Sequence, residues 1–205
     1  LRRSRGLGDV YKRQAEHVKE VWLPVNQLGD REGLTYSDGE IMMPDEFKNA
    51  YKESVDAGWL STSCKPEHGG MGVPIFFQTV IWAEFGTSAN MALSVLPALS
   101  VGVYEVLAEH GEKELVDYFA TNMASGKWSG TMCLTEPHAG TDLGMISTKA
   151  VPQNDGTYLV TGTKIFITYG EHDMTENIVH LVLAKTPDAP EGTRGISLFL
   201  SLIHI

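Results

Sequence analysis

The stretch Met132-Cys-Leu-Thr-Glu-Pro-His-Ala-Gly-Thr-Asp142 lies where the chain changes its character. It opens on an apolar, strand-like run, Thr131 to Leu134, and continues into a turn where Pro137, Gly140 and Asp142 leave backbone N–H groups and a hydroxyl exposed. Such a loop can cradle an anion or the electron-rich edge of a ring. It equally suits a plain surface connection in which Asp142 caps a short helix.

Before this stretch the apolar residues recur at helical spacing. Between Pro44 and Trp59 they fall four apart, which predicts an amphipathic helix. Further helices are predicted at Val73 to Phe85, between Leu96 and Gly111, and at Glu112 to Met123, each burying the others. Gly126 is expected to end this helical part.

Beyond Trp128 the period changes to two. Gln153-Asn-Asp-Gly156 is a hairpin signal between strands predicted at Ser147 to Val151 and Tyr158 to Gly162. Helices followed by strands predict an α+β fold with antiparallel β structure, not βαβ units and a parallel sheet. Three further runs have strand-like lengths: Lys164 to Tyr169, Ile178 to Lys185 and Gly195 to Leu200.

Composition excludes several classes of partner. The chain has 205 residues, of which 42% are hydrophobic, and a formal net charge of -10. Nucleic acids and anionic lipids require positive charge, so neither is expected to bind. Apolar stretches such as Val73 to Trp82 fall short of the about 20 residues of a membrane span. With no secretory signal peptide, we expect a cytoplasmic protein in which Cys64 and Cys133 are reduced thiols.

The two ends of the chain differ from the rest. Residues 1–14, LRRSRGLGDVYKRQ, are rich in Arg and Lys and show no helical or strand period. A basic arm, a transit peptide or vector sequence would each have this composition. We expect residues 1–14 to be non-native or disordered and residues 201–205, SLIHI, to be non-native, and we expect the chain to be a fragment.

The sequence does not match the common motifs for nucleotide binding, metal binding or nucleophilic catalysis. The Gly126-Lys127 pair is followed by Trp128 where a Walker loop needs Ser or Thr, and no glycine run joins a strand to a helix as in a Rossmann motif. His172, Glu176 and His180 are spaced for one helix face, but their segment reads as turn and strand, so we expect solvated positions and no metal site. Nothing selects a Ser-His-Asp or Cys-His site.

A second segment, Lys164-Ile-Phe-Ile-Thr-Tyr-Gly170, is predicted to be a strand with Lys164, Phe166 and Thr168 on one face. This pairing suits an aromatic cofactor whose face packs on Phe166 while a ring nitrogen meets Thr168. It equally suits a core aromatic beside a hydrogen-bonded threonine.

Taken together, TMCLTEPHAGTD (131–142) and GTKIFITYG (162–170) resemble the flavin-contacting segments of the acyl-CoA dehydrogenase family. PEHGGMG (66–72) and SANMALSVLPALS (88–100) support the resemblance. It covers residues 15–200 and implies an amino-terminal helical domain at 15–125 and an antiparallel, β-barrel-like middle domain at 126–200. We expect the family's carboxy-terminal helical domain to be missing from this fragment. NQLGDREG (26–33) and residues 168–199 resemble the subgroup that contains 3-methylmercaptopropionyl-CoA dehydrogenase.

The resemblance implies α,β-dehydrogenation of an acyl-CoA thioester, with hydride transfer to FAD and electrons passing to an electron-transferring flavoprotein. The resemblance places the catalytic carboxylate in that carboxy-terminal domain, so we expect no catalytic base among these residues and expect the fragment alone to be inactive. Glu136, in the flavin loop, is expected to be structural. The full-length protein is expected to be a homo-oligomer. An acyl-CoA oxidase and a non-catalytic flavin or acyl-CoA binding module remain alternatives.

The same resemblance assigns residues to the cofactor. Leu134 and Thr135 are expected to meet the pyrimidine edge of the flavin, and Thr168 to lie near N5. Thr141 stands where the family usually has Ser and would also bond the acyl-CoA, and Phe166 stands where many members have Trp. The full predicted cofactor set is Met132, Cys133, Leu134, Thr135, Gly140, Thr141, Phe166, Ile167 and Thr168.

Overall fold

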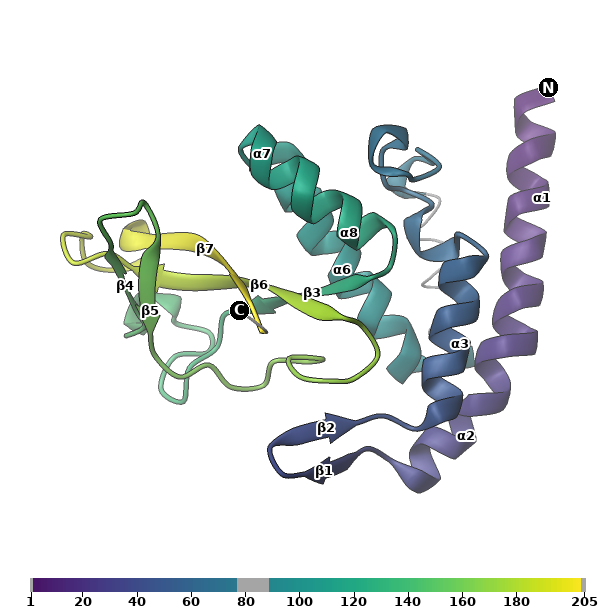
Figure 1. Cartoon of the computed structure of the whole chain (residues 1–205), viewed down its shortest axis with the longest axis horizontal. Coiled ribbons are helices and arrows are strands. Elements are labelled where there is room, and N and C mark those ends of the chain that lie inside the picture. The colour runs from purple at the N-terminus through teal and green to yellow at the C-terminus, as the bar shows by residue number, and fades with distance from the viewer. Residues whose placement is uncertain (1, 77–88, 204–205) are drawn as a thin grey trace.

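The computed structural model describes residues 2–76 and 89–203, which form a group of helices beside a mixed β-sheet (Figure 1). Helices come first in the chain and the five-stranded sheet last, as predicted. The helices are α1 (Arg2–His17), a π-helical turn (Val18–Trp22), α2 (Leu23–Glu32), α3 (Asp45–Asp56), α6 (Met91–His110), α7 (Lys113–Leu115), a second π-helical turn (Val116–Ala120) and α8 (Thr121–Ala124).

Helix α3 confirms the amphipathic pattern. Pro44 precedes it, and Asp45 and Glu46 occupy its first turn, where acidic side chains favour the positive end of a helix. The hydroxyl of Ser54, on the buried face, accepts a hydrogen bond from Trp22 Nε1 at 2.9 Å. This bond connects α3 to the π-helical turn that follows α1.

The predicted helix before Gly111 is α6, which is longer than its apolar pattern indicates. Asn90 caps its start by accepting a hydrogen bond from Leu93 N at 3.0 Å, and Gly111 ends it. By length and composition α6 resembles a membrane span, with a mean hydropathy of 1.7, but it packs here against the sheet. Of the helix predicted at Val73 to Phe85, residues 77–85 lie outside the described residues.

At the amino terminus Arg2–His17 form helix α1, although residues 1–14 show no helical period. Leu, Arg, Lys and Gln all have good helix propensity, so a helix does not need a clear apolar period. Gln14 is buried near the end of α1, and Val18, just beyond it, belongs to the core around Trp22 and Phe47. Packing of these last turns orders a segment whose pattern is weak.

The sheet has the order β3-β6-β4-β5, with β7 paired to β6. Strand β6 runs parallel to β3, with Gly130 beside Val179, and antiparallel to β7. The predicted antiparallel pairing is present between β4 and β5 and between β6 and β7, but β6 pairs in parallel with β3 and β4, and the described strands do not close into a barrel. The strands are β3 (Trp128–Cys133), β4 (Lys149–Pro152), β5 (Tyr158–Thr161), β6 (Asn177–Lys185) and β7 (Ile196–Leu202).

The direction of β6 follows from the long connection that precedes it. Parallel neighbours need a crossover of a dozen residues or more, whereas antiparallel neighbours need only a tight turn. The chain between β3 and β6 contains the whole β4–β5 hairpin, so it can return to the starting end of β3. Local alternation of apolar residues is identical in both directions and does not reveal this return.

A small hairpin within the helical part was not predicted. Strands β1 (Thr35–Ser37) and β2 (Glu40–Met42) pair through a two-residue turn at Asp38 and Gly39. Both turn residues have positive φ, 54° and 90°, as a type I′ turn requires. The Asp-Gly dipeptide was the signal, but the three-residue strands are too short to show an alternating pattern.

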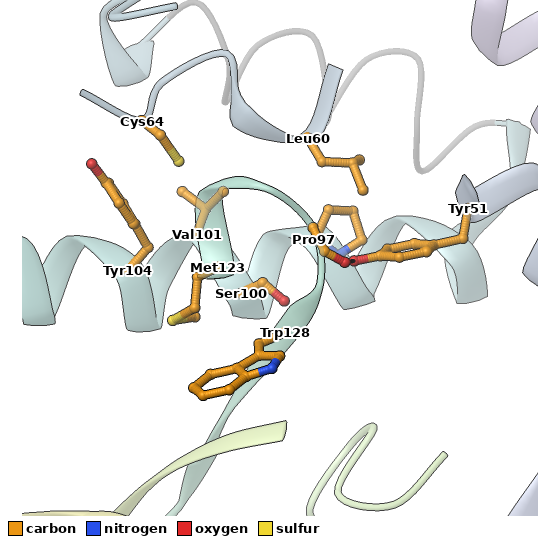
Figure 2. Close-up of a pocket in the computed structure, with 10 residues that line it drawn as sticks. Tyr51, Leu60, Cys64, Pro97, Ser100, Val101, Tyr104, Met123 and Trp128 are labelled. Carbon is orange, nitrogen blue, oxygen red and sulfur yellow. Dashed lines mark hydrogen bonds between the residues drawn. The ribbon is translucent and has the colours of Figure 1, made fainter. Parts of the chain in front are cut away.

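The helices and the sheet meet where α6 crosses β3. Gly130 N donates a hydrogen bond to Ser100 Oγ at 3.0 Å, and the core here contains Val103, Met123 and Trp128. Figure 2 shows a cavity beside this joint, with Tyr51 pointing toward Pro97. Its volume of about 10 Å³ is roughly that of one water molecule, so it is too small for an organic ligand.

Gly130 allows this close approach, and its replacement is expected to weaken the fold. A Cβ at this position would lie 2.7 Å from Val103 Cβ and 2.8 Å from Met123 Cε. Gly130→Ala should lower the free energy of unfolding by about 1–3 kcal/mol, as overpacking does. The matched control is Gly102→Ala on the exposed side of α6, where a Cβ meets nothing within 4 Å.

Urea unfolding of both variants checks this prediction. Gly102→Ala should raise the unfolding free energy by about 0.5–1 kcal/mol, because alanine restricts the unfolded chain and favours helix. Two variants with the same change in stability would contradict the packing argument.

Candidate functional site

The two segments predicted to form the site lie side by side. Ile165 N donates a hydrogen bond to Thr135 O at 2.9 Å, and Lys164 Nζ donates to Leu134 O at 3.0 Å. Segments 30 residues apart in sequence are therefore joined directly after β3 ends at Cys133. The predicted proximity of the two motifs is present in the structure.

Glu136 holds this arrangement together. Its side chain is 2% exposed, and its carboxylate accepts hydrogen bonds from both the backbone N–H and the hydroxyl of Ser147, at 2.7 and 2.8 Å. Thr148 donates in the same way, from N at 3.0 Å and from Oγ1 at 2.5 Å. Lys164 Nζ completes the set at 2.9 Å. These contacts agree with the structural role expected for Glu136.

The charge on Glu136 is stabilised by these donors. Burial alone would raise its pKa, because it disfavours the charged form. The hydrogen bonds from Thr148, Ser147 and Lys164 outweigh burial and hold the pKa of Glu136 well below its ordinary value. A carboxylate that already accepts these hydrogen bonds, and whose pKa is lowered by them, is a poor base for removing a proton from a substrate.

The predicted strand at Lys164 to Tyr169 is absent. Phe166 and Tyr169 have positive φ angles, 59° and 53°, a backbone conformation that residues other than glycine rarely adopt. Gly170 N closes a turn on Ile167 O at 3.0 Å. The segment with the alternating apolar pattern is therefore a folded loop. Lys164, Phe166 and Thr168 do not share a strand face.

The side chains of the predicted cofactor set differ widely in exposure. Phe166 is 88% exposed and Met132 is 37% exposed, whereas Cys133 is 7% exposed and its thiol lies 3.6 Å from Thr131 Oγ1. Cys133 can therefore reach a cofactor only through its backbone. The exposed members are Met132, Gly140, Thr141, Phe166 and Thr168, and the half-buried members are Leu134, Thr135 and Ile167.

The loop of residues 166–174, which we call the strap, is anchored to three elements. Tyr169 Oη donates a hydrogen bond to Ala92 O at 2.7 Å, at the start of α6. His172 Nε2 lies 3.1 Å from Ser129 Oγ on β3. Asp173 accepts a hydrogen bond from Met43 N at 2.8 Å. The strap therefore connects the sheet to the helical part.

Asp173 also binds Lys48 on α3, with Oδ2 at 2.8 Å from Nζ. Burial would raise the pKa of Asp173, but the hydrogen bonds from Lys48 and Met43 N outweigh it and lower that pKa. The carboxylate is thus charged when it anchors the strap beside α3 and the β1–β2 hairpin.

Two histidines expected to be solvated are buried instead. His172 is 3% exposed and His180 is 9% exposed, and His180 Nδ1 lies 2.6 Å from Thr131 Oγ1. Burial lowers the pKa of both, to about 4 for His172. Their partners, Ser129 and Thr131, lie on β3, so each ring is directed to its own hydroxyl and the two do not converge with Glu176 on a metal. Their spacing gave no signal of this burial.

A hollow of about 600 Å³ opens between the strap and the helical part. Thr168, Tyr169 and Glu171 contribute from the strap, and Asn26 and Asp30 from α2. Most of the remaining wall is apolar: Leu34, Met43, Pro44, Phe47, Met91 and Ala92. A hollow of this size and character fits a small organic ligand.

Comparison with known proteins identifies the class of this fold and site. The acyl-CoA dehydrogenase N-terminal domain matches residues 33–127, and the acyl-CoA dehydrogenase middle domain matches residues 131–201. The chain belongs to the acyl-CoA dehydrogenase family, whose members are FAD-dependent oxidoreductases. The family resemblance drawn from residues 131–142 and 162–170 is thereby confirmed.

Individual relatives agree with this assignment. The chain is 48% identical over 181 residues to the 3-methylmercaptopropionyl-CoA dehydrogenase of Ruegeria pomeroyi, which covers 88% of this chain and 31% of that protein. It therefore spans about a third of the length of that relative.

Solved structures share the fold. Butyryl-CoA dehydrogenase from Megasphaera elsdenii superposes with a TM-score of 0.79 at 22% identity, covering 97% of this chain and 48% of that chain. An acyl-CoA dehydrogenase from Bacillus anthracis, solved in complex with FAD, superposes with a TM-score of 0.74 at 22% identity, covering 96% of this chain and 30% of that chain.

The Glu136 network makes a prediction about stability and pH. Glu136→Gln should lower the free energy of unfolding at pH 7 by about 3 kcal/mol, because donors that face a buried carboxylate lose their charged acceptor. Since the folded-state pKa lies below the unfolded value, the stabilisation is complete above that unfolded value and declines as pH falls below it.

Urea unfolding from pH 7 to pH 3 tests this prediction on both proteins. The gap between native chain and variant should narrow below about pH 4.3, where unfolded glutamate begins to bind protons. Glu109→Gln, at an exposed position on α6, serves as control and should change stability by less than about 0.5 kcal/mol. A gap independent of pH would contradict the assignment.

Proposed function

We propose that this chain supplies the flavin and acyl-chain surfaces of an enzyme that dehydrogenates acyl-CoA thioesters between the α and β carbons. The observation that supports the proposal is the exposure of Phe166 together with its positive φ angle. Phe166 is 88% exposed, and its backbone is held in a strained, left-handed conformation beside the Ile165–Thr135 bond. Strain of this kind is typical of functional positions.

The residues present fit a flavin. An exposed aromatic face suits packing against a planar ring, and such contacts add about 0.5–1.5 kcal/mol beyond the area they bury. Among the described residues, none shares a hydrogen bond with the Thr168 hydroxyl, so it is free to bond a ring nitrogen. The residues that would hold FAD are the exposed and half-buried members of the predicted set, with the backbone of Cys133.

When bound, FAD would accept the β-hydrogen as a hydride at N5. The chain's own contribution is to orient and stabilise. The Thr168 hydroxyl would donate a hydrogen bond beside N5. Leu134 and Thr135 would contact the pyrimidine edge, where hydrogen-bond donors stabilise negative charge. Thr141, exposed on the loop after Pro137, would bond the acyl-CoA.

The base that removes the α-proton is not assigned within this chain. Glu136 directly follows Thr135 of the predicted cofactor set, but its oxygens already accept five hydrogen bonds. We propose that the base comes from a carboxy-terminal helical domain like that of the family, and that the electrons then pass to an electron-transferring flavoprotein. Alone, the described chain would bind without turning over.

Two alternatives share the same site. An acyl-CoA oxidase would transfer the electrons to oxygen and release peroxide, and a non-catalytic binding module would bind acyl-CoA without bleaching the flavin. Peroxide release and flavin absorbance, measured on the protein encoded at the natural locus, separate the three. Because the relative from Ruegeria pomeroyi is 48% identical, 3-methylmercaptopropionyl-CoA is the first substrate to test.

Substitutions at the strap test the flavin assignment. Phe166→Ala should weaken FAD binding by about threefold to tenfold, because it removes an aromatic contact. Thr168→Val should slow flavin reduction by acyl-CoA by about a hundredfold, because it removes a donor to the developing charge.

Thr168→Ser keeps the hydroxyl and is the matched control, with a reduction rate close to that of the native protein. FAD affinity is read from flavin fluorescence, and reduction from the loss of flavin absorbance in a stopped-flow instrument. Equal rates for the valine and serine variants would show that the hydroxyl does not act at N5.

A further inference from the structure

The hollow beside the strap extends from the proposed reacting centre, and this inference rests on the proposed function. A hydride moves only between atoms held about 3–3.5 Å apart, so the β carbon must lie next to the flavin atom that Thr168 contacts. Thr168 is also part of the wall of the hollow. The acyl chain beyond its β carbon therefore extends into the hollow.

The wall facing that chain is rigid as well as apolar. Phe47 is 2% exposed, and its ring packs directly on Gly29, where a Cβ would lie 2.5 Å from ring atoms Cε2 and Cζ. Tyr169 is bonded to Ala92 O at the start of α6. Neither wall can retreat freely, so the hollow has a defined size for an alkyl or other uncharged chain.

The charges at the hollow are all of one sign. Asp30 on α2 and Glu171 on the strap both line it, and carboxylates are negatively charged at neutral pH. Among the described residues of the lining, none carries a positive charge. The nearby Lys48 already forms salt bridges from Nζ with Asp45 at 3.0 Å and with Asp173 at 2.8 Å, and Asp173 also accepts the hydrogen bond from Met43 N.

We propose that Asp30 and Glu171 make this hollow a selective site for acyl chains with an uncharged end, and that they exclude acyl chains ending in a carboxylate. In water, the repulsion between two like unit charges about 4 Å apart lowers binding affinity roughly fivefold. The phosphates of coenzyme A are repelled by the same carboxylates, so the thioester enters with its acyl end first.

The test compares two acyl-CoA substrates with equal carbon number, hexanoyl-CoA and its ω-carboxylated counterpart adipyl-CoA. It uses the flavin-loaded protein encoded at the natural locus and measures kcat/KM for flavin reduction. Hexanoyl-CoA should be preferred by at least about tenfold. The preference should decrease at high salt, since the hollow is open to solvent.

Substitutions then assign the preference to the two carboxylates. Asp30→Asn combined with Glu171→Gln should raise the adipyl-to-hexanoyl ratio by about tenfold. The control pair, Glu109→Gln with Glu112→Gln, removes the same charge at the far end of α6 and should leave the ratio unchanged. Ala92→Leu narrows the hollow without changing charge and should lower kcat/KM for decanoyl-CoA more than for butyryl-CoA.

The outcomes separate this inference from the proposed function. Reduction of the flavin by hexanoyl-CoA and adipyl-CoA with equal kcat/KM, or a ratio that the double variant does not change, overturns the inference alone. A flavin-loaded protein that no acyl-CoA reduces overturns the proposed function and the inference with it. Equal kcat/KM values in the native protein overturn the inference without any variant, whereas a preference for hexanoyl-CoA is assigned to Asp30 and Glu171 by the double variant, whose kcat/KM for hexanoyl-CoA shows that it is folded.

Discussion

The burial of a charged carboxylate at Glu136 is the constraint on which the rest of the site depends. Such a charge is stable in the interior only if it is paired and hydrogen-bonded. Ser147, Thr148 and Lys164 meet that need from segments before and after the β4–β5 hairpin. Because these donors must converge on one carboxylate, the loop after β3 and the segment that begins the strap are drawn together.

The strap converts this local arrangement into a relation between the sheet and the helices. Loops are usually mobile, and a site on a loop is accurate only when its surroundings hold it. His172 secures the strap to β3, Tyr169 to α6 and Asp173 to Met43 beside α3. Thr168 directly precedes Tyr169, and on its other side Ile165 N is bonded to Thr135 O, so hydrogen bonds hold the chain on both sides of Thr168. The imidazole of His172 is buried where it holds the strap to β3.

Much of the fold was predictable because its signals are local. The four-residue spacing of α3, the Gly111 end of α6 and the Asn-Asp-Gly turn between β4 and β5 each reflect a period or a turn within a few residues. The errors concern features without such signals. The segment from Lys164 to Tyr169 has the alternating pattern of a strand, but Phe166 and Tyr169 adopt left-handed backbone.

By itself, the sequence determined the order of helices and strands, the two segments that meet at the site and, through those segments, the family. Each of these depends on residue type and spacing along the chain. Only the tertiary structure decided the parallel direction of β6, the burial of His172 and His180, and the enclosure of a hollow by α2, α3, α6 and the strap. These depend on contacts between residues far apart in sequence, because long connections and burial are set by the packing of whole elements and not by any local period.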